Sequence, residues 1–117
     1  MGQIDLPDFD FLMDMINIIG SLSTKKENLE LDIISLEARV VIVATTDEKY
    51  FVGGKPPSMS FVEATYKRTG FDGEIMQKRR ELAVVSSELE VARKSFDLAK
   101  QKIEVWRSLQ ANERSMA

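Results

Sequence analysis

Apolar residues recur at helical spacing along most of the chain. After Pro7 they follow one another in steps of three and four residues, which predicts a helix over about residues 7–22. A second series with the same steps predicts another helix over about residues 25–45. We expect two separate helices because Gly20 and Ser21 weaken the helix between them. The first would then be an extra helix at the N-terminal end of the fold.

The end of the second apolar series could also form a β-strand instead of a helix. Val40–Ala44 is a largely β-branched run that also suits a strand, and Lys49–Val52 could pair with it as a hairpin. The helix is favoured because the apolar steps of three and four continue through the run. Glycine and proline pairs then end any regular element, so we expect a loop over about residues 46–60 and a short helix over about 61–69.

The longest predicted helix covers about residues 73–111, since neither Pro nor Gly follows Gly73. Its apolar positions form a heptad seam that consists of Leu82, Val85, Leu89, Ala92, Phe96, Ala99, Ile103 and Trp106. A two-stranded pair of helices needs only such a seam. A second apolar row at the same seven-residue spacing therefore predicts contact with another copy of the chain. The residues of this row, the predicted oligomer interface, are Val84, Val91, Leu98 and Val105.

Together these patterns predict an all-α fold that forms a single domain over residues 1–117. The expected architecture is a long antiparallel helical hairpin, similar to a coiled coil, with the extra N-terminal helix. A chain of this length and form has a thin core, which association between copies would supplement. We therefore expect a self-associating protein, a homo-oligomer.

The amino-acid composition excludes several kinds of chemical site. The chain contains no Cys and no His, which excludes disulfides, thiolate metal sites and the commonest general base. Gly53-Gly54-Lys55 is too short for a phosphate-binding loop. We expect neither enzymatic activity, nor a cofactor, nor a bound metal, nor a small-molecule substrate. Apolar runs are too short to cross a bilayer and no leader pattern is present, so we expect a cytoplasmic protein without a membrane partner.

The middle of the chain combines cations with aromatic rings, although the net charge of the whole chain is −3. Such a mixture is typical of grooves that bind single-stranded nucleic acid, where cations meet phosphates and rings stack on bases. The candidate nucleic-acid-binding residues are Lys55, Lys67, Arg68, Lys78, Arg79, Arg80 and Tyr66. The alternative is an ordinary solvated region whose rings are buried.

About half of the chain resembles the UvsY-type phage recombination mediators. The resembling segments are Tyr50-Phe51-x-Gly53-Gly54-Lys55, then Tyr66-Lys67-Arg68-Thr69, then Trp106-Arg107 near the end of the long helix. The resemblance implies a small helical protein that forms rings, binds single-stranded DNA and loads a recombinase onto strands coated by single-strand-binding protein. It also implies DNA contacts at Lys55, Lys67 and Arg68. The chain departs from that family in its acidic net charge.

The function expected from the sequence is that of a non-enzymatic oligomeric helical scaffold or mediator. It would bind single-stranded DNA, or recombination proteins bound to it, and under the resemblance it would be phage-encoded and act in the host cytoplasm. The alternative is a protein-binding module without nucleic-acid binding. That alternative includes an assembly or inhibitor protein, and a prefoldin-like chaperone if residues 40–52 form a β-hairpin.

Overall fold

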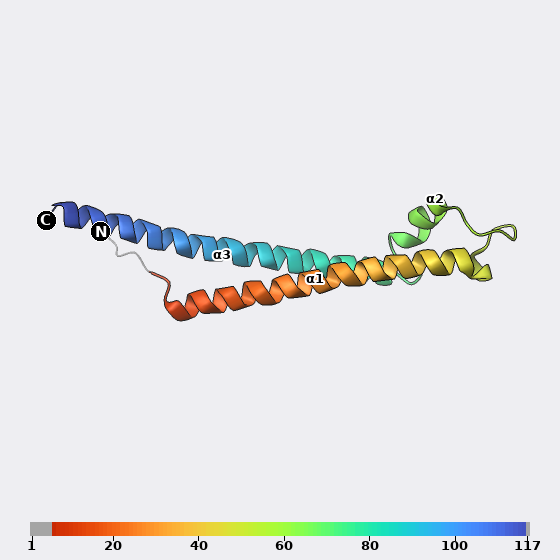
Figure 1. Ribbon diagram of the computed structural model, residues 1–117, viewed down its shortest axis with the longest axis horizontal. Coiled ribbons are helices and arrows are strands. Elements are labelled where there is room, and N and C mark those ends of the chain that lie inside the picture. Colours follow the sequence, from red (N-terminus) through yellow and green to blue (C-terminus); the bar gives the residue numbers. More distant parts are fainter. Residues whose placement is uncertain (1–5, 117) are drawn as a thin grey trace. The chain divides into compact units, whose positions relative to one another are not determined.

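The computed structural model describes residues 6–116 and is helical almost throughout (Figure 1). Two long helices, α1 and α3, are joined by a segment that holds short helical turns. The elements in chain order are α1 (Phe9–Thr46), η1 (Glu48–Tyr50), α2 (Met59–Val62), η2 (Glu63–Lys67) and α3 (Glu74–Met116). The expectation of an all-α fold is confirmed for the part of the chain that the structure describes.

The chain divides into two compact units, and α1 and α3 each contribute to both. Unit 1 combines Met1–Ser23 with Ser86–Ala117, and unit 2 is the continuous stretch Thr24–Val85. The candidate nucleic-acid-binding residues all belong to unit 2. Most of the predicted oligomer interface belongs to unit 1.

Helix α1 is continuous where the sequence predicted two helices, so the expected break at Gly20 and the extra N-terminal helix are wrong. The two apolar series share one heptad register, because position 26 lies four residues after Leu22 and three before Leu29. Lys26 occupies that position, is half-buried and reaches Glu30 at 4.0 Å. A lysine stem can cover apolar surface while its charged head stays in water, so the helix runs through.

Asp8 determines where α1 begins. Its Oδ1 atom accepts a hydrogen bond of 2.7 Å from the backbone N–H of Phe11, which is the contact that an N-terminal cap makes. The helix therefore starts at Phe9, and Pro7 precedes the cap instead of opening the helix.

The core of unit 2 lies between α1 and the start of α3. It consists of Ile33 and Val40 from α1 and Ile75 from α3, with half-buried side chains packed around them. Those surrounding side chains are Leu36, Tyr66, Phe71 and Leu82. Ile75 is completely buried, and burial of such a side chain stabilises a fold by about 1.5–3 kcal/mol.

The β-hairpin alternative for residues 40–52 is wrong, because α1 continues to Thr46. The hydroxyl of Thr45 donates to the carbonyl of Val41 at 2.7 Å, a bond that threonine makes within helices. Among the described residues β pairing is limited to one bridge, between Val52 and Lys55. That bridge closes a tight turn over two glycines with positive φ, so the prefoldin-like arrangement loses its hairpin.

The short helix begins at Met59, earlier than the predicted boundary near residue 61. Ser58 caps it, since its Oγ atom accepts from the N–H of Phe61 at 3.2 Å. The helix then widens into the π-helical turn η2, which ends at Lys67. The predicted loop over residues 46–60 is likewise interrupted by η1.

Glu74 fixes the start of α3. Its carboxylate accepts hydrogen bonds from the backbone N–H groups of Phe71 at 3.2 Å and Asp72 at 2.8 Å. Burial raises the pKa of Glu74, but the backbone N–H groups around it and the charge of Arg39 outweigh burial and lower that pKa. Gly70 leaves room for this carboxylate, because a Cβ atom there would collide with it, and its φ of +86° suits glycine.

In unit 1 the seam of α3 is covered near its middle. Leu89, Ala92 and Ala99 are buried there, while Phe96 is half-buried. The side chains of α1 at the matching heptad positions are half-buried as well, namely Leu12, Met15, Ile19 and Leu22. Trp106, at the end of the seam, stays 40% exposed, so the burial does not extend to the last turns.

Candidate functional site

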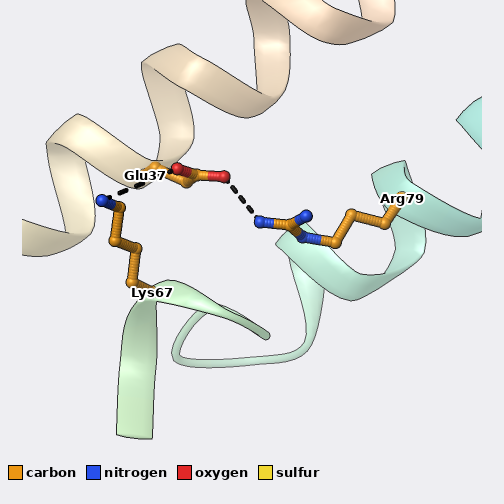
Figure 2. A network of polar contacts seen from close by, with 3 residues as sticks. All are labelled: Glu37, Lys67 and Arg79. Atoms are coloured by element: carbon orange, nitrogen blue, oxygen red, sulfur yellow. Dashed lines mark hydrogen bonds and ion pairs between the residues drawn. The ribbon is translucent and has the colours of Figure 1, made fainter. Parts of the chain in front are cut away.

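Two of the candidate DNA-binding cations meet on a single carboxylate, that of Glu37 (Figure 2). Arg79 donates from Nη2 to Oε1 of Glu37 at 2.6 Å, and Nζ of Lys67 lies 4.0 Å from Oε2. The Glu37 side chain is only 21% exposed. The three residues come from α3, η2 and α1, so the network joins three elements of unit 2. Both cations therefore have an internal electrostatic partner.

Lys78 is paired in a similar way. Its Nζ atom lies 3.7 Å from Asp32 on α1 and 4.0 Å from Glu81 on its own helix. Like Lys67 and Arg79, it keeps more than a third of its side chain exposed. Exposed pairs of this kind are weak, so a phosphate could compete for these cations.

Tyr66 lies in an aromatic cluster on the core of unit 2. Its ring meets Tyr50 edge-on at 5.5 Å, Phe71 at 5.0 Å and Phe61 at 6.0 Å between centroids. The ring is half-buried, and Tyr50 stacks on Phe71 at 4.4 Å. Phe61 is 44% exposed, so the cluster is covered only in part.

Lys55, Arg68 and Arg80 are exposed and make no ion pair within residues 6–116. Arg68 lines an open depression of about 370 Å³ in unit 2. The other lining residues are Glu37, Glu63, Lys67 and Arg79. Three cations and two carboxylates leave this depression with one net positive charge. Arg68 is thus the cation here that is best placed to meet an outside anion.

An apolar depression adjoins the cationic one and shares Glu37 and Lys67 with it. Its remaining walls come from the outer face of α1, where Ile34 is 63% and Ile42 62% exposed. Ala38 and Val41 complete this wall. The sequence contains the signal for this face, since Leu31, Ile34, Ala38 and Val41 also follow one another in steps of three and four. Sequence analysis did not single it out as a surface.

The predicted oligomer interface on α3 is uncovered in the single chain. The exposed fractions are 58% for Val84, 62% for Val91, 54% for Leu98 and 52% for Val105. In unit 1, Leu98 also lines an open pocket of about 380 Å³ with Leu6, Pro7 and Phe11 among its other walls. The row is therefore available to a partner molecule.

Several charged residues of α3 that face solvent pair along the helix. Lys94 reaches Glu90 at 2.9 Å, and this contact is the main reason that the pKa of Glu90 is lowered. Lys100 pairs with Asp97 and Arg107 with Glu104 in the same manner. Pairs of this type add only about 0.2–0.5 kcal/mol each, so they form a solvated surface rather than a site.

No helix within residues 6–116 combines the length and the apolar character that a bilayer crossing requires. In the same range no three carboxylate side chains gather as they would around a metal ion. No family model, curated protein or solved structure matches the chain.

Proposed function

We propose that this chain is a non-enzymatic helical scaffold that works as a homo-oligomer. The observation that supports the proposal is the row Val84, Val91, Leu98 and Val105, four apolar side chains that are each more than half exposed. They recur every seven residues along α3, which is the spacing of a helix that packs along a neighbour. A second copy of the chain is the partner that would cover them.

The size of this row sets what it can contribute. Complete burial of a Val or Leu side chain is worth about 1.5–3 kcal/mol, so covering the exposed halves of four is worth roughly 3–6 kcal/mol. Association costs about 4–15 kcal/mol before any contact is counted. The row can therefore align copies, but a stable assembly needs further contacts beside it.

The experiment is sedimentation velocity of the full chain and of a variant with Val91→Asp and Leu98→Asp. We expect the variant to sediment as a lighter species than the wild type at equal concentration, because two charges would be buried without partners. Ala83→Asp is the control, since it adds one aspartate at an exposed position outside the row, and each single variant, Val91→Asp or Leu98→Asp, is compared with it. Equal sedimentation of wild type and double variant would remove the row as an interface.

Binding of single-stranded DNA, or of recombination proteins on it, is the second candidate function. It is supported by the exposed cations Lys55, Arg68 and Arg80 and by the resemblance to UvsY-type mediators. One such cluster binds weakly, but its repetition in an oligomer raises the effective concentration of the next site. Without DNA binding, the chain would be a protein-binding module of the assembly or inhibitor type.

Fluorescence anisotropy of a labelled single strand at several salt concentrations tests the DNA candidate. Each phosphate contact that is lost should reduce the slope of log affinity against log salt by about 0.7. We expect that reduction for Arg68→Ala and for Arg80→Ala, but not for Lys94→Ala, whose cation is paired with Glu90. Absence of binding at low salt, with the oligomer intact, would leave the protein-binding module.

A further inference from the structure

Unit 2 presents a surface that combines apolar side chains with cations. It is formed by the two depressions that share Glu37 and Lys67. We call it the receiving patch, and its residues are Ile34, Ala38, Val41, Ile42, Lys67 and Arg68. Its apolar part is bordered by Glu37 and Lys67, which pair with each other. Its cationic edge also includes Arg79 and Glu63 and has one net positive charge, with Arg68 unpaired among the described residues. Such a surface suits an acidic segment that also carries apolar side chains.

The N-terminal end of α1 is a segment of that chemistry. Phe9, Met13 and Ile16 lie on one ridge of the helix, at intervals of four and three residues, and all three are exposed, Phe9 by 73%. Asp10 and Asp14 come directly after Phe9 and Met13 on the same helix, and both are exposed. Residues 6–24 contain three carboxylates and no Lys or Arg. We call this segment, Asp8–Ile18, the acidic end.

We propose that the acidic end of one copy of the chain docks on the receiving patch of another copy. The ridge of Phe9, Met13 and Ile16 would cover Ile34 and Ile42, and Ala38 between them is small enough to admit a close approach of the two helices. Asp10 and Asp14 would then lie near Arg68 and Lys67. Phe9, Ile34 and Ile42 are exposed in the single chain, and the net charges of the two surfaces are opposite.

The two surfaces differ, so the contact is heterologous. Each copy then has one acidic end and one receiving patch to offer, and copies add head to tail in a closed ring or an open filament. This inference rests on the proposed oligomer and supplies the second contact that the apolar row of α3 requires. It also sets the polarity of the assembly, which the row alone leaves undefined.

Charge exchange tests the contact. The variants are Asp10→Lys with Asp14→Lys, Arg68→Glu, and a triple variant that combines all three changes. We expect the first two to weaken association measured by sedimentation at least about tenfold, because each brings like charges together. The triple variant restores opposite charges and should return to within about threefold of the wild type. Failure of the triple variant to recover, with helix content unchanged by circular dichroism, overturns the inference.

Two further variants keep the test informative if lysine disturbs the first turn of α1, where acidic residues favour the helix. Asp10→Asn with Asp14→Asn removes the charge without reversing it, and Ile34→Gln removes an exposed apolar side chain of the receiving patch. Both should weaken association. Lys55→Glu is the control, since Lys55 is exposed and outside both surfaces, and it should leave association unchanged.

The outcomes separate this inference from the proposed function. The first outcome is an oligomer whose mass falls with Val91→Asp and Leu98→Asp but does not change with any substitution at Asp10, Asp14, Arg68 or Ile34. That outcome contradicts the head-to-tail contact and supports the proposed scaffold. A wild-type chain that is monomeric at all concentrations contradicts both.

Discussion

Arg79 and Glu37 are joined by a hydrogen bond of 2.6 Å although 42 residues separate them in the chain. The bond connects α3 with α1 in unit 2, and Lys67 adds a third element to the same carboxylate. Cations that the sequence marks as candidate DNA contacts are thus also structural. Any loss of DNA binding in variants of Lys67 or Arg79 has to be separated from a loss of stability.

Glu37→Gln should destabilise unit 2 by about 1–2 kcal/mol, because a charge-assisted bond is lost and Lys67 is left without its partner. The loss is small because both cations remain partly exposed to solvent, which weakens their pairing. Urea denaturation followed by circular dichroism measures the change. Glu113→Gln, at an exposed position near the end of α3, is the control and should change stability by less than about 0.5 kcal/mol.

Substitution by alanine should change stability in opposite directions at Gly70 and Gly20. Gly70→Ala places a Cβ atom against the Glu74 carboxylate at a φ of +86°, so we expect a loss of about 1–2 kcal/mol or more. Gly20→Ala adds a methyl group into open space within a helix, so we expect a gain of about 0.5–1 kcal/mol. Thermal denaturation of both variants checks this, and equal effects would contradict the continuous α1.

Glu74 should make stability depend on pH in the acid range. Its pKa is lowered in the folded chain, so the folded state favours the charged form more than the unfolded state does. The resulting stabilisation is complete above the ordinary value of 4.5 and is lost as the pH falls through the lower, folded pKa. Urea midpoints measured from neutral pH down to about pH 3 should therefore fall more steeply for the wild type than for Glu74→Gln. Parallel curves would show that the N–H groups of Phe71 and Asp72 do not hold the carboxylate.

Substitutions of Tyr66 distinguish a ring that packs in the core from a ring that stacks on a nucleic-acid base. Tyr66→Phe keeps all the ring contacts to Tyr50, Phe61 and Phe71, so stability should change by less than about 0.5 kcal/mol. Tyr66→Ala should cost about 2–3 kcal/mol, less than for a fully buried ring because Tyr66 is half-buried. Denaturant unfolding of the two variants gives both values. A small effect of Tyr66→Ala would indicate a ring that is free to stack on a base.

Sequence patterns were sufficient for the long helices but not for the boundary between the first two. The predicted break depended on Gly20 and Ser21. No apolar residue lies between Leu22 and Leu29. In the structure Lys26 fills that heptad position, and its partial burial keeps the register unbroken. A search for apolar positions at helical spacing passes over a lysine, so the continuity of α1 could not be predicted from that spacing.

The candidate site was harder to predict because it depends on contacts between distant residues. Local spacing brings Lys67, Lys78 and Arg79 into one basic segment, but it does not reveal that Glu37 and Asp32 on another helix face them. The aromatic residues of the same segment contact one another, but Tyr50, Tyr66 and Phe71 are half-buried and Phe61 is exposed. The second apolar face of α1 was visible as spacing, yet only exposure shows that Ile34 and Ile42 are uncovered.

One copy of this chain leaves many large apolar side chains exposed, among them Phe9, Ile34 and Val91, and we propose that another copy covers them. Light scattering coupled to size exclusion, performed on the full chain over a wide range of concentrations, tests it most directly. We expect a mass of at least two chains that persists on dilution into the micromolar range. A mass of one chain at every concentration, with the helix content intact, would contradict it.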